Sequence, residues 1–298
     1  METDDHDRLL VEGDNLAFMS ALPAGIVDLI VTDPPFFTGR RRIISPRPAG
    51  ADAAHSTPGF DDQWKTLADY LAFMRPRLEA IRRLLRPKGS LVIHLDWRVV
   101  HAVRLELDEV FGPDRFVNEI IWHYTGGGRA RRYFSRKHDT LLWYARGDSW
   151  TFNIDAVRVP YKATSGFARG GITARSGKHY SPHPAGTPLD DVWDLPIINP
   201  LSPERCGYPT QKPELLLERI VLALSRPGDL VVDPFCGSGT SVVVAARHGR
   251  RWCACDCSPQ AIAIARRRLE RETGGRPLIG RRPARREGDR PQPAHPPA

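Results

Sequence analysis

The sequence predicts an α/β protein in which one sheet of mostly parallel strands carries helices on both faces. Strand-like and helix-like patterns alternate along the chain, as they do where helices cross over between parallel strands. A Gly-rich turn joins a strand to a helix at residues 231–240, and α/β folds bind anionic or nucleotide ligands at such turns. The 298 residues allow one large domain or two small ones, and we expect one domain with insertions.

The individual elements follow from local patterns of apolar residues and from turn signals. Strands are expected at residues 8–14, 27–33, 89–96, 118–124, 139–147, 229–233 and 251–256, and helices at 15–23, 67–85, 98–112, 213–225, 240–247 and 258–270. Within the helix at 67–85, Pro76 predicts a kink or a break. Gly112 and Pro113 close the helix that precedes them.

Two segments lack such patterns. Residues 151–207 have no clear period and many Gly, Pro and Ser residues, so we expect an insertion outside the regular sheet. The last segment, residues 271–298, is rich in Pro and Arg and cannot bury enough apolar surface to become ordered. We therefore expect a disordered basic tail.

Composition narrows the class of protein. The net charge of +8 favours a polyanionic partner without proving one. No run of roughly 18 apolar residues exists to span a membrane, and the acidic N-terminus is unlike a signal peptide. We therefore expect a cytoplasmic protein. The alternate spacing of Cys253, Cys255 and Cys257 does not match the usual CxxC pair, so we expect reduced thiols and no metal site.

The stretch VVDPFCGSGT at residues 231–240 has the features of a nucleotide-binding turn. Gly237 and Gly239 allow a sharp turn and a close approach to a ligand. No lysine follows Gly239, as a phosphate-binding P-loop requires, and the dinucleotide pattern GxGxxG also fails. Asp256 ends the next strand, where an acid can accept hydrogen bonds from both hydroxyls of a ribose. Together these features favour an adenosine ligand without a diphosphate over a merely structural turn.

The stretch DLIVTDPPFFTG at residues 28–39 ends a strand with an acid, two prolines and a ring. Each proline fixes its own φ, and the first also restricts the residue before it. The Asp33 carboxylate and the Pro34 carbonyl can then face one small polar group while Phe36 offers a stacking surface. Two acceptors and a ring suit an exocyclic amine on a flat heterocycle. A strand-ending turn is the structural alternative.

The two stretches together resemble the S-adenosylmethionine-dependent DNA amino-methyltransferases. Their order, with DPPF first and the Gly-rich loop last, resembles the circularly permuted β group and the modification methylases of phages and type III-like systems. The resemblance covers nearly all of residues 8–270. It implies a Rossmann-like methyltransferase fold, with a catalytic half at 1–150, an inserted target-recognition region at 151–207, a cofactor-binding half at 208–270, and the tail at 271–298.

The resemblance also implies roles for individual residues. Catalysis is assigned to Asp33, Pro34, Pro35 and Phe36. Binding of S-adenosylmethionine is assigned to Asp14 at the adenine, Asp256 at the ribose, Asp233, Phe235, Gly237, Ser238, Gly239 and Thr240 around the methionine part, and Thr210, Gln211 and Lys212 near the methionine carboxylate. Phe36 departs from the family, which more often has Tyr here; stacking survives that change and a phenolic hydrogen bond is lost.

A basic loop at residues 124–139 carries the predicted contacts to DNA. Its cations are Arg129, Arg131, Arg132, Arg136 and Lys137, interleaved with Tyr133 and Phe134. Cations with aromatic support are typical of phosphate and base contacts, although a solvated loop is the alternative. The loop at residues 38–50 is expected to close over a flipped base.

The predicted function is transfer of a methyl group from S-adenosylmethionine to the exocyclic N6 of an adenine flipped out of double-stranded DNA. Asp33 and Pro34 would accept the hydrogens of the amine, and no metal is needed. Cytosine N4 is the alternative base, and a catalytically silent DNA-binding relative is the alternative class. The basic insertion and the permuted order argue against an RNA or protein substrate. A homodimer and a cognate restriction nuclease are left open as further partners.

Overall fold

The structure, a computed structural model, describes residues 8–44, 57–126, 128–275 and 278–280. Its main strands are β1 (Leu9–Glu12), β2 (Val27–Thr32), β5 (Leu85–Leu95), β6 (Phe116–His123), β7 (His138–Ala145), β10 (Val192–Asp194), β11 (Leu230–Asp233), β12 (Arg251–Asp256) and β13 (Leu278–Gly280). Its α-helices are α1 (Asn15–Ala21), α2 (Leu67–Leu84), α3 (Val100–Phe111), α4 (Gly166–Gly170), α5 (Glu214–Leu224), α6 (Thr240–Arg247) and α7 (Pro259–Thr273). Two hairpins pair β3 (Arg40–Ile44) with β4 (Thr57–Asp62) and β8 (Ile172–Thr173) with β9 (His179–Tyr180).

Within the described residues the main strands form one nine-stranded sheet in the order β10-β6-β7-β5-β2-β11-β12-β1-β13. Strand β7 runs antiparallel to both of its neighbours, and every other neighbouring pair is parallel. The predicted α/β sheet of mostly parallel strands is confirmed. Strands β11 and β12, from the C-terminal part of the chain, lie between β2 and β1, as the permuted order of the motifs implies.

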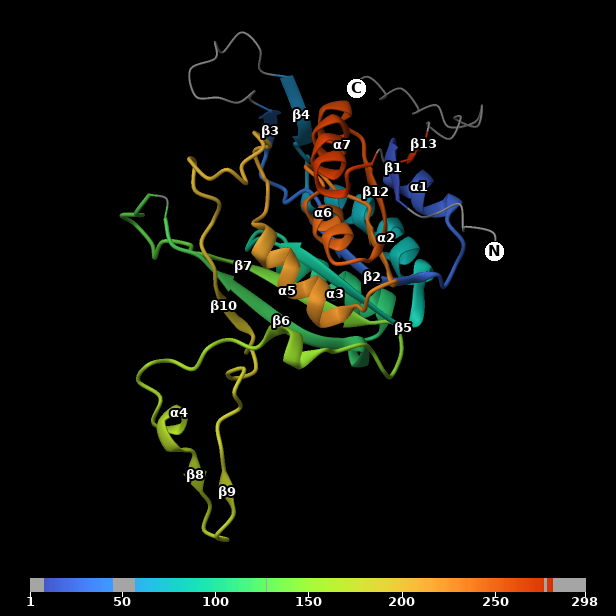
Figure 1. Cartoon of the computed structure of the whole chain (residues 1–298). Helices are drawn as coiled ribbons and strands as arrows, with labels where there is room; N and C mark the ends of the chain where they lie inside the picture. The colour runs from blue at the N-terminus through green and yellow to red at the C-terminus, as the bar shows by residue number, and fades with distance from the viewer. Residues whose placement is uncertain (1–7, 45–56, 127, 276–277, 281–298) are drawn as a thin grey trace, which may run out of the picture.

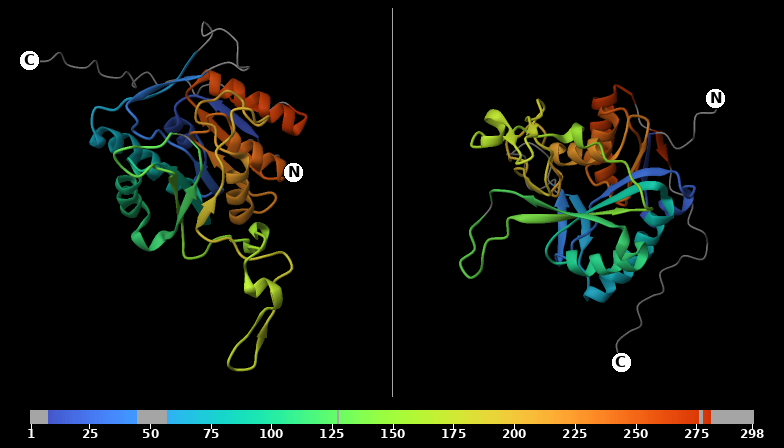
Figure 2. Two further views of the ribbon diagram at one scale, coloured as in Figure 1. Left: turned by 90° about the vertical axis from the view of Figure 1, so that its left-hand side faces the viewer. Right: turned by 90° about the horizontal axis from the view of Figure 1, so that it is seen from below.

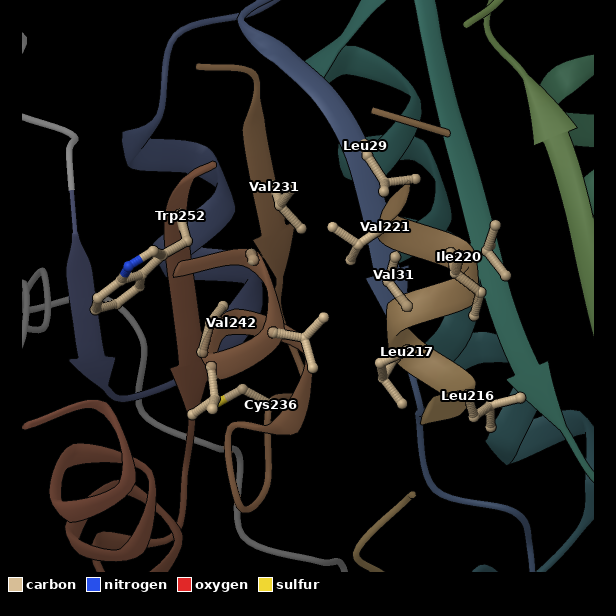
Figure 3. Close-up of a cluster of buried hydrophobic side chains, with 14 of the residues drawn as sticks. Leu29, Val31, Leu216, Leu217, Ile220, Val221, Val231, Cys236, Val242 and Trp252 are labelled. Atoms are coloured by element: carbon tan, nitrogen blue, oxygen red, sulfur yellow. The ribbon is translucent and has the colours of Figure 1, made fainter. Parts of the chain in front are cut away.

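Helices cover both faces of the sheet, with α1, α2 and α3 on one face and α5, α6 and α7 on the other (Figure 1). The pleat of the strands sends alternate side chains to the two cores. Leu29 and Val31 contact the core under α5, where Figure 3 shows Val221 and its neighbours directed toward them, whereas Ile30 belongs to the opposite core. Because the central strands are buried on both faces, they appear in the sequence as almost continuous apolar runs.

The same alternation explains the cysteine pattern on β12. Cys253 and Cys255 both pack into the core under α1–α3, whereas Trp252 and Ala254 pack into the other core. Among the described residues, no group of three or more His, Cys, Asp or Glu side chains is placed to hold a metal ion. In the same part of the chain, no helix has the length and apolar character that a membrane crossing requires.

The order of the strands creates a switch point at the centre of the sheet. From β1 the chain passes over β12 and β11 to reach β2, and β11 and β2 are direct neighbours. Crossovers therefore leave this centre in opposite directions, which opens a crevice at the carboxyl ends of the two strands. Asp33 follows β2 and Asp233 ends β11. The two predicted motifs thus meet at one edge of the sheet.

The expectation that the insertion at residues 151–207 lies outside the regular sheet is only partly correct. Strand β10 pairs with β6 as the edge strand, with Trp193 buried and the indole N–H of Trp122 donating to the carbonyl of Leu195 at 2.9 Å. A strand of three residues is too short to show a period in the sequence. The part that contains α4 and the β8–β9 hairpin does extend away from the sheet (Figures 1 and 2).

Three further local expectations need correction. Helix α2 continues through Pro76, so a break there is wrong; its buried face, which includes Tyr70 and Met74, packs firmly enough to offset the lost hydrogen bond. Part of the loop at 38–50 forms strand β3, and closure of this loop over a flipped base stays a prediction. The prediction that the chain is disordered from residue 271 onward is wrong for two segments. Helix α7 continues to Thr273, and β13 pairs with β1. Residues 45–56 and 281–298 lie outside the described part of the chain, and the domain boundaries stay predictions.

Candidate active site

A cavity of about 340 Å³ lies at the carboxyl ends of the central strands. Both predicted motifs line it, although they are some 200 residues apart in the sequence. The predicted catalytic and cofactor residues in its wall are Asp14, Asp33, Pro34, Pro35, Phe36, Thr210, Lys212, Asp233, Phe235, Gly237, Ser238, Thr240 and Asp256. Gln211 and Gly239 are not among the lining residues. The volume and the mixed lining suit a ligand of nucleoside size.

Asp33 is held between the imidazole of His94 and the ammonium group of Lys212. One carboxylate oxygen lies 2.8 Å from Nδ1 of His94, and the other accepts a hydrogen bond from the ammonium group of Lys212. Burial raises the pKa of Asp33, but Lys212 and His94 together outweigh burial and leave that pKa below its ordinary value. The carboxylate is therefore ionised at neutral pH, as an acceptor of amine hydrogens must be. Lys212 also donates to the Thr210 carbonyl at 3.2 Å.

His94 was not identified from the sequence as part of the site. It lies on β5 with its side chain 5% exposed, and its Nε2 is 3.2 Å from a carboxylate oxygen of Asp139 on β7. The one available signal was a polar residue inside the apolar run LVIHL, which a structural histidine would equally explain. Contact with Asp33 requires β2 and β5 to be neighbours, and only the sheet order shows that.

The turn after Asp33 is fixed by two contacts from other elements. The hydroxyl of Tyr70, on α2, donates to the Pro35 carbonyl at 2.8 Å. Phe37 has a left-handed φ of 58°, which is unusual for a bulky side chain. The Asp62 carboxylate accepts hydrogen bonds from the backbone amides of Phe37 and Thr38, each at 2.9 Å. Asp62 is 1% exposed and was also missed from the sequence.

Phe36 packs within the cavity beside the charged groups. Its ring meets the ring of His94 edge to face at 5.1 Å between centroids, and the ammonium of Lys212 lies 5.3 Å from its centre. These contacts orient the ring without covering it completely, since Phe36 lines the cavity. A flat base can stack on such a ring.

The Gly-rich loop follows Asp233, whose carboxylate organises it. This group accepts hydrogen bonds from the amide of Phe235 at 3.0 Å, from the Thr32 hydroxyl at 3.1 Å and from the Ser241 hydroxyl. Burial raises the pKa of Asp233 to about 7, although those hydrogen bonds act in the opposite direction. At Gly237, with φ of 50°, an added Cβ would lie 2.9 Å from the Tyr208 ring.

Asp256 and Asp14 line the cavity, yet their oxygens also serve the backbone. Asp256 accepts from the amides of Gly237 at 2.9 Å and Ser258 at 2.8 Å, and burial raises its pKa. Asp14 caps α1, and its second oxygen lies 3.0 Å from the guanidinium of Arg77. Oδ1 of Asp14 already accepts from two amides, but its other oxygen and both oxygens of Asp256 each have a second lone pair for a ligand.

Gln211 and Gly239 have supporting positions. The Gln211 side chain accepts from the amide of Cys206 at 2.8 Å and donates to the Glu204 carbonyl at 2.7 Å, so it braces its own loop. Gly239 has φ of 76°, and an added Cβ would lie 2.7 Å from the Cβ of Ala265. A close approach between the start of α6 and helix α7 therefore requires glycine here.

The predicted DNA-contacting residues lie apart from the cavity, on the loop between β6 and β7. This loop projects from the sheet in the right-hand view of Figure 2. Arg129, Arg131, Arg132 and Arg136 are exposed, and Lys137 is partly buried. The Arg136 guanidinium lies over the rings of Trp97, at 3.7 Å, and Tyr133, at 4.6 Å. Lys137 donates to the Gly126 carbonyl, which steadies the loop.

The lining residues fit S-adenosylmethionine by their chemistry. Lys212 and the hydroxyl of Thr210 suit a carboxylate, the buried acid Asp233 suits an ammonium, and Asp256 suits ribose hydroxyls. The absence of a side chain at Gly237 leaves open a space that a Cβ would fill. The Asp33 carboxylate is not among the groups that this molecule requires, and it contacts His94 and Lys212 of the protein.

Comparisons with known proteins agree with this fold and site. A family model described as DNA methylase matches residues 27–267. The type II methyltransferase M.HpaI of Haemophilus parainfluenzae is 30% identical over 284 residues, covering 95% of this chain and 81% of that protein. The DNA adenine methyltransferase YhdJ of Escherichia coli (strain K12) is 30% identical over 265 residues, covering 88% and 83%.

A solved structure extends the comparison to the fold. TTHA0409 of Thermus thermophilus, in complex with S-adenosylmethionine, has a TM-score of 0.57 and 22% identity, covering 92% of this chain and 97% of that one. The family model spans most of this chain, and the matches to both relatives extend over most of their length. The chain therefore belongs to the DNA methylase family, and the DNA methyltransferase predicted from the sequence is confirmed.

Proposed function

We propose that this DNA methyltransferase transfers a methyl group to the exocyclic N6 of adenine. The observation that carries the proposal is the cavity that joins the DPPF turn to the Gly-rich loop. Transfer of a methyl group from the sulfonium of S-adenosylmethionine to an exocyclic amine requires a nucleoside site and acceptors for that amine in one cavity. S-adenosylmethionine is the methyl donor of this enzyme and supplies the methyl group on a sulfonium.

The residues of the turn act on the target base. The ionised Asp33 and the Pro34 carbonyl accept hydrogen bonds from the two N–H groups of the amine, which draws its nitrogen toward tetrahedral geometry and frees its lone pair. The nitrogen gives up one of these two protons as it becomes methylated. Pro35 keeps the turn rigid, and Phe36 stacks on the base. The base must leave the duplex to reach this depth, at a cost of about a few kcal/mol.

The remaining predicted residues bind the donor and the DNA. Lys212 and Thr210 hold the carboxylate end of the donor, Asp233 its amino group, Asp256 its ribose and Asp14 its adenine. The exposed arginines of the β6–β7 loop contact DNA phosphates, and the projecting part of residues 151–207 recognises the target sequence. A homodimer and a cognate nuclease stay predictions.

Adenine is favoured over cytosine by three considerations. A carboxylate at the position of Asp33 accompanies adenine in most of the resembling enzymes, and Phe36 can stack on a purine over a larger area than on a pyrimidine. YhdJ, one of the 30% identical relatives, is named as an adenine methyltransferase. The hydrogen bonds alone fit both amines.

Nucleoside mass spectrometry of DNA from cells that express the protein tests the base. We expect N6-methyladenine, and N4-methylcytosine without methyladenine would contradict the assignment. Asp33→Ala is expected to abolish tritium transfer while calorimetric affinity for S-adenosylmethionine changes by no more than a few-fold. The exposed Asp114→Ala serves as the matched control. Equal loss of transfer and of cofactor affinity would mean that Asp33 is structural.

A further inference from the structure

A buried imidazole joins two carboxylates at the base of the candidate site. Nδ1 of His94 lies 2.8 Å from Asp33, and Nε2 lies 3.2 Å from Asp139. The three residues belong to the end of β2, to β5 and to β7, which are consecutive in the sheet. Neither His94 nor Asp139 was assigned a role in the proposed transfer. Both are nevertheless connected to its central carboxylate.

The Asp33–His94–Asp139 bridge is complete when His94 donates a hydrogen bond to each of the two carboxylates. Whether it can do so depends on the number of protons on His94. A neutral imidazole has one N–H and can donate to only one carboxylate, while its other nitrogen presents a lone pair to an anion. An imidazolium donates to both. The charged group that also faces this pair is Lys212, on the far oxygen of Asp33, and the Tyr124 hydroxyl donates to Asp139 at 3.3 Å. Two carboxylates, one ammonium and one imidazolium sum to zero charge.

We propose that His94, with a proton on both nitrogens, is a positioning residue that keeps Asp33 ionised and in one orientation for the target amine. The inference rests on the proposed function, in which Asp33 accepts the hydrogens of that amine. Each oxygen of Asp33 uses one lone pair on a cation and keeps another for the substrate. Asp139 acts one step further away, because it holds the second N–H of His94.

The electrostatics of the buried group agree with this arrangement. Burial lowers the pKa of His94, and so does Lys212, but the two carboxylates outweigh both and raise that pKa above its ordinary value. Burial raises the pKa of Asp139, yet its contact with His94 brings that pKa below the usual value. The bridge therefore holds while both carboxylates are ionised and His94 is protonated, and it is lost as pH rises through the raised pKa of His94.

Because the bridge is lost at high pH, its loss should be visible in the pH dependence of methyl transfer. The turnover number should fall on the alkaline side as His94 loses a proton. Asp139→Asn removes one of the two anions that favour the imidazolium, so it should lower the pKa of His94 and move the alkaline limb to lower pH. His94→Gln, whose amide cannot donate to both carboxylates, should lower turnover by about 10- to 100-fold.

The experiment combines two readouts on the full chain. NMR of 13C-labelled histidine follows the His94 titration in the wild type and in Asp139→Asn, and single-turnover tritium transfer is measured across the same pH range. We expect a wild-type His94 pKa above about 6.5 and a joint downward shift of both readouts in Asp139→Asn. In His94→Gln, cofactor affinity and KM for DNA should stay within a few-fold. The exposed changes His101→Gln and Asp114→Asn are the matched controls.

Three results would overturn the proposal. They are a wild-type His94 that titrates at or below the ordinary value, an alkaline limb that stays in place while the NMR titration moves, and a His94→Gln variant that loses cofactor affinity as much as turnover. The NMR titration of the wild type needs no substitution, so a variant that fails to fold does not remove the test. A wild type that transfers no methyl group to DNA would instead refute the proposed function, and the NMR titration would still decide whether the bridge exists.

Discussion

The Asp62 carboxylate accepts a hydrogen bond of 2.9 Å from the backbone amide of Phe37, which has a left-handed φ of 58°. A bulky residue keeps such a φ only where its surroundings impose it, at a cost on the order of 1–3 kcal/mol. Asp62 also binds the amide of Thr38 and the indole N–H of Trp64. One buried acid thus holds the far end of the DPPF turn, and the position of Phe36 depends on it.

Replacing Asp62 by Ala leaves the partly buried amides of Phe37 and Thr38 without their acceptor. We expect the free energy of unfolding to fall by about 2–3 kcal/mol, and methyl transfer to fall more than cofactor affinity, because the turn serves the target base. Denaturant unfolding, tritium transfer and calorimetry measure the three quantities, with Asp114→Ala as the control. Lost stability with an unchanged transfer rate would show that Asp62 does not position the turn.

The ion pair between Lys212 and Asp33 predicts a change in pH dependence. Lys212 lowers the pKa of Asp33, so Lys212→Gln should raise that pKa. The acceptor would then become protonated at a higher pH, and the acidic limb of the transfer rate should move upward. Single-turnover rates at saturating cofactor test this, with the exposed Lys88→Gln as the control. An acidic limb at the wild-type position would mean that Lys212 does not tune Asp33.

The buried Asp233 predicts a pH dependence of stability. Burial raises its pKa to about 7 from an ordinary value of 3.8, so the folded protein holds this proton more tightly than the unfolded chain. The wild type therefore loses stability as pH rises from about 3.8, the ordinary pKa, to about 7, the pKa in the folded protein. Asp233→Asn has no such proton to lose. The difference in unfolding free energy between Asp233→Asn and the wild type should therefore shift in favour of the variant by on the order of 2–3 kcal/mol from about pH 5 to about pH 8. Urea unfolding at both pH values measures the difference, and Asp114→Asn should show none.

The exposed arginines of the β6–β7 loop predict the salt dependence of DNA binding. Arg131→Ala combined with Arg132→Ala should flatten the plot of log affinity against log salt by roughly one unit for each phosphate contact removed. Fluorescence anisotropy with a duplex measures this slope. Arg271→Ala, an exposed cation on α7, is the matched control. A slope equal to that of the wild type would show that the phosphate contacts lie on another surface of the protein.

The sequence by itself determined the elements and the residues at their ends. Strands β2, β11 and β12 and helix α6 occur where the local patterns predicted them, because an apolar run or a helical period is a property of neighbouring residues. Asp33, Asp233 and Asp256 end or follow these strands for the same reason. The carboxyl ends of parallel strands meet at one edge, so their presence in one cavity followed as well.

Only the tertiary structure decided which side chains from distant segments meet. His94, Asp139 and Lys212 gather around Asp33 because β2, β5 and β7 are consecutive strands and the turn before α5 folds over their ends. Asp62 contacts Phe37 from the end of β4, and the Gln211 side chain braces its own loop. Strand β10 became regular only by pairing with β6. Residue spacing encodes local geometry, whereas the order of strands in a sheet arises from the packing of the whole chain, and that order selects the partners of each charge.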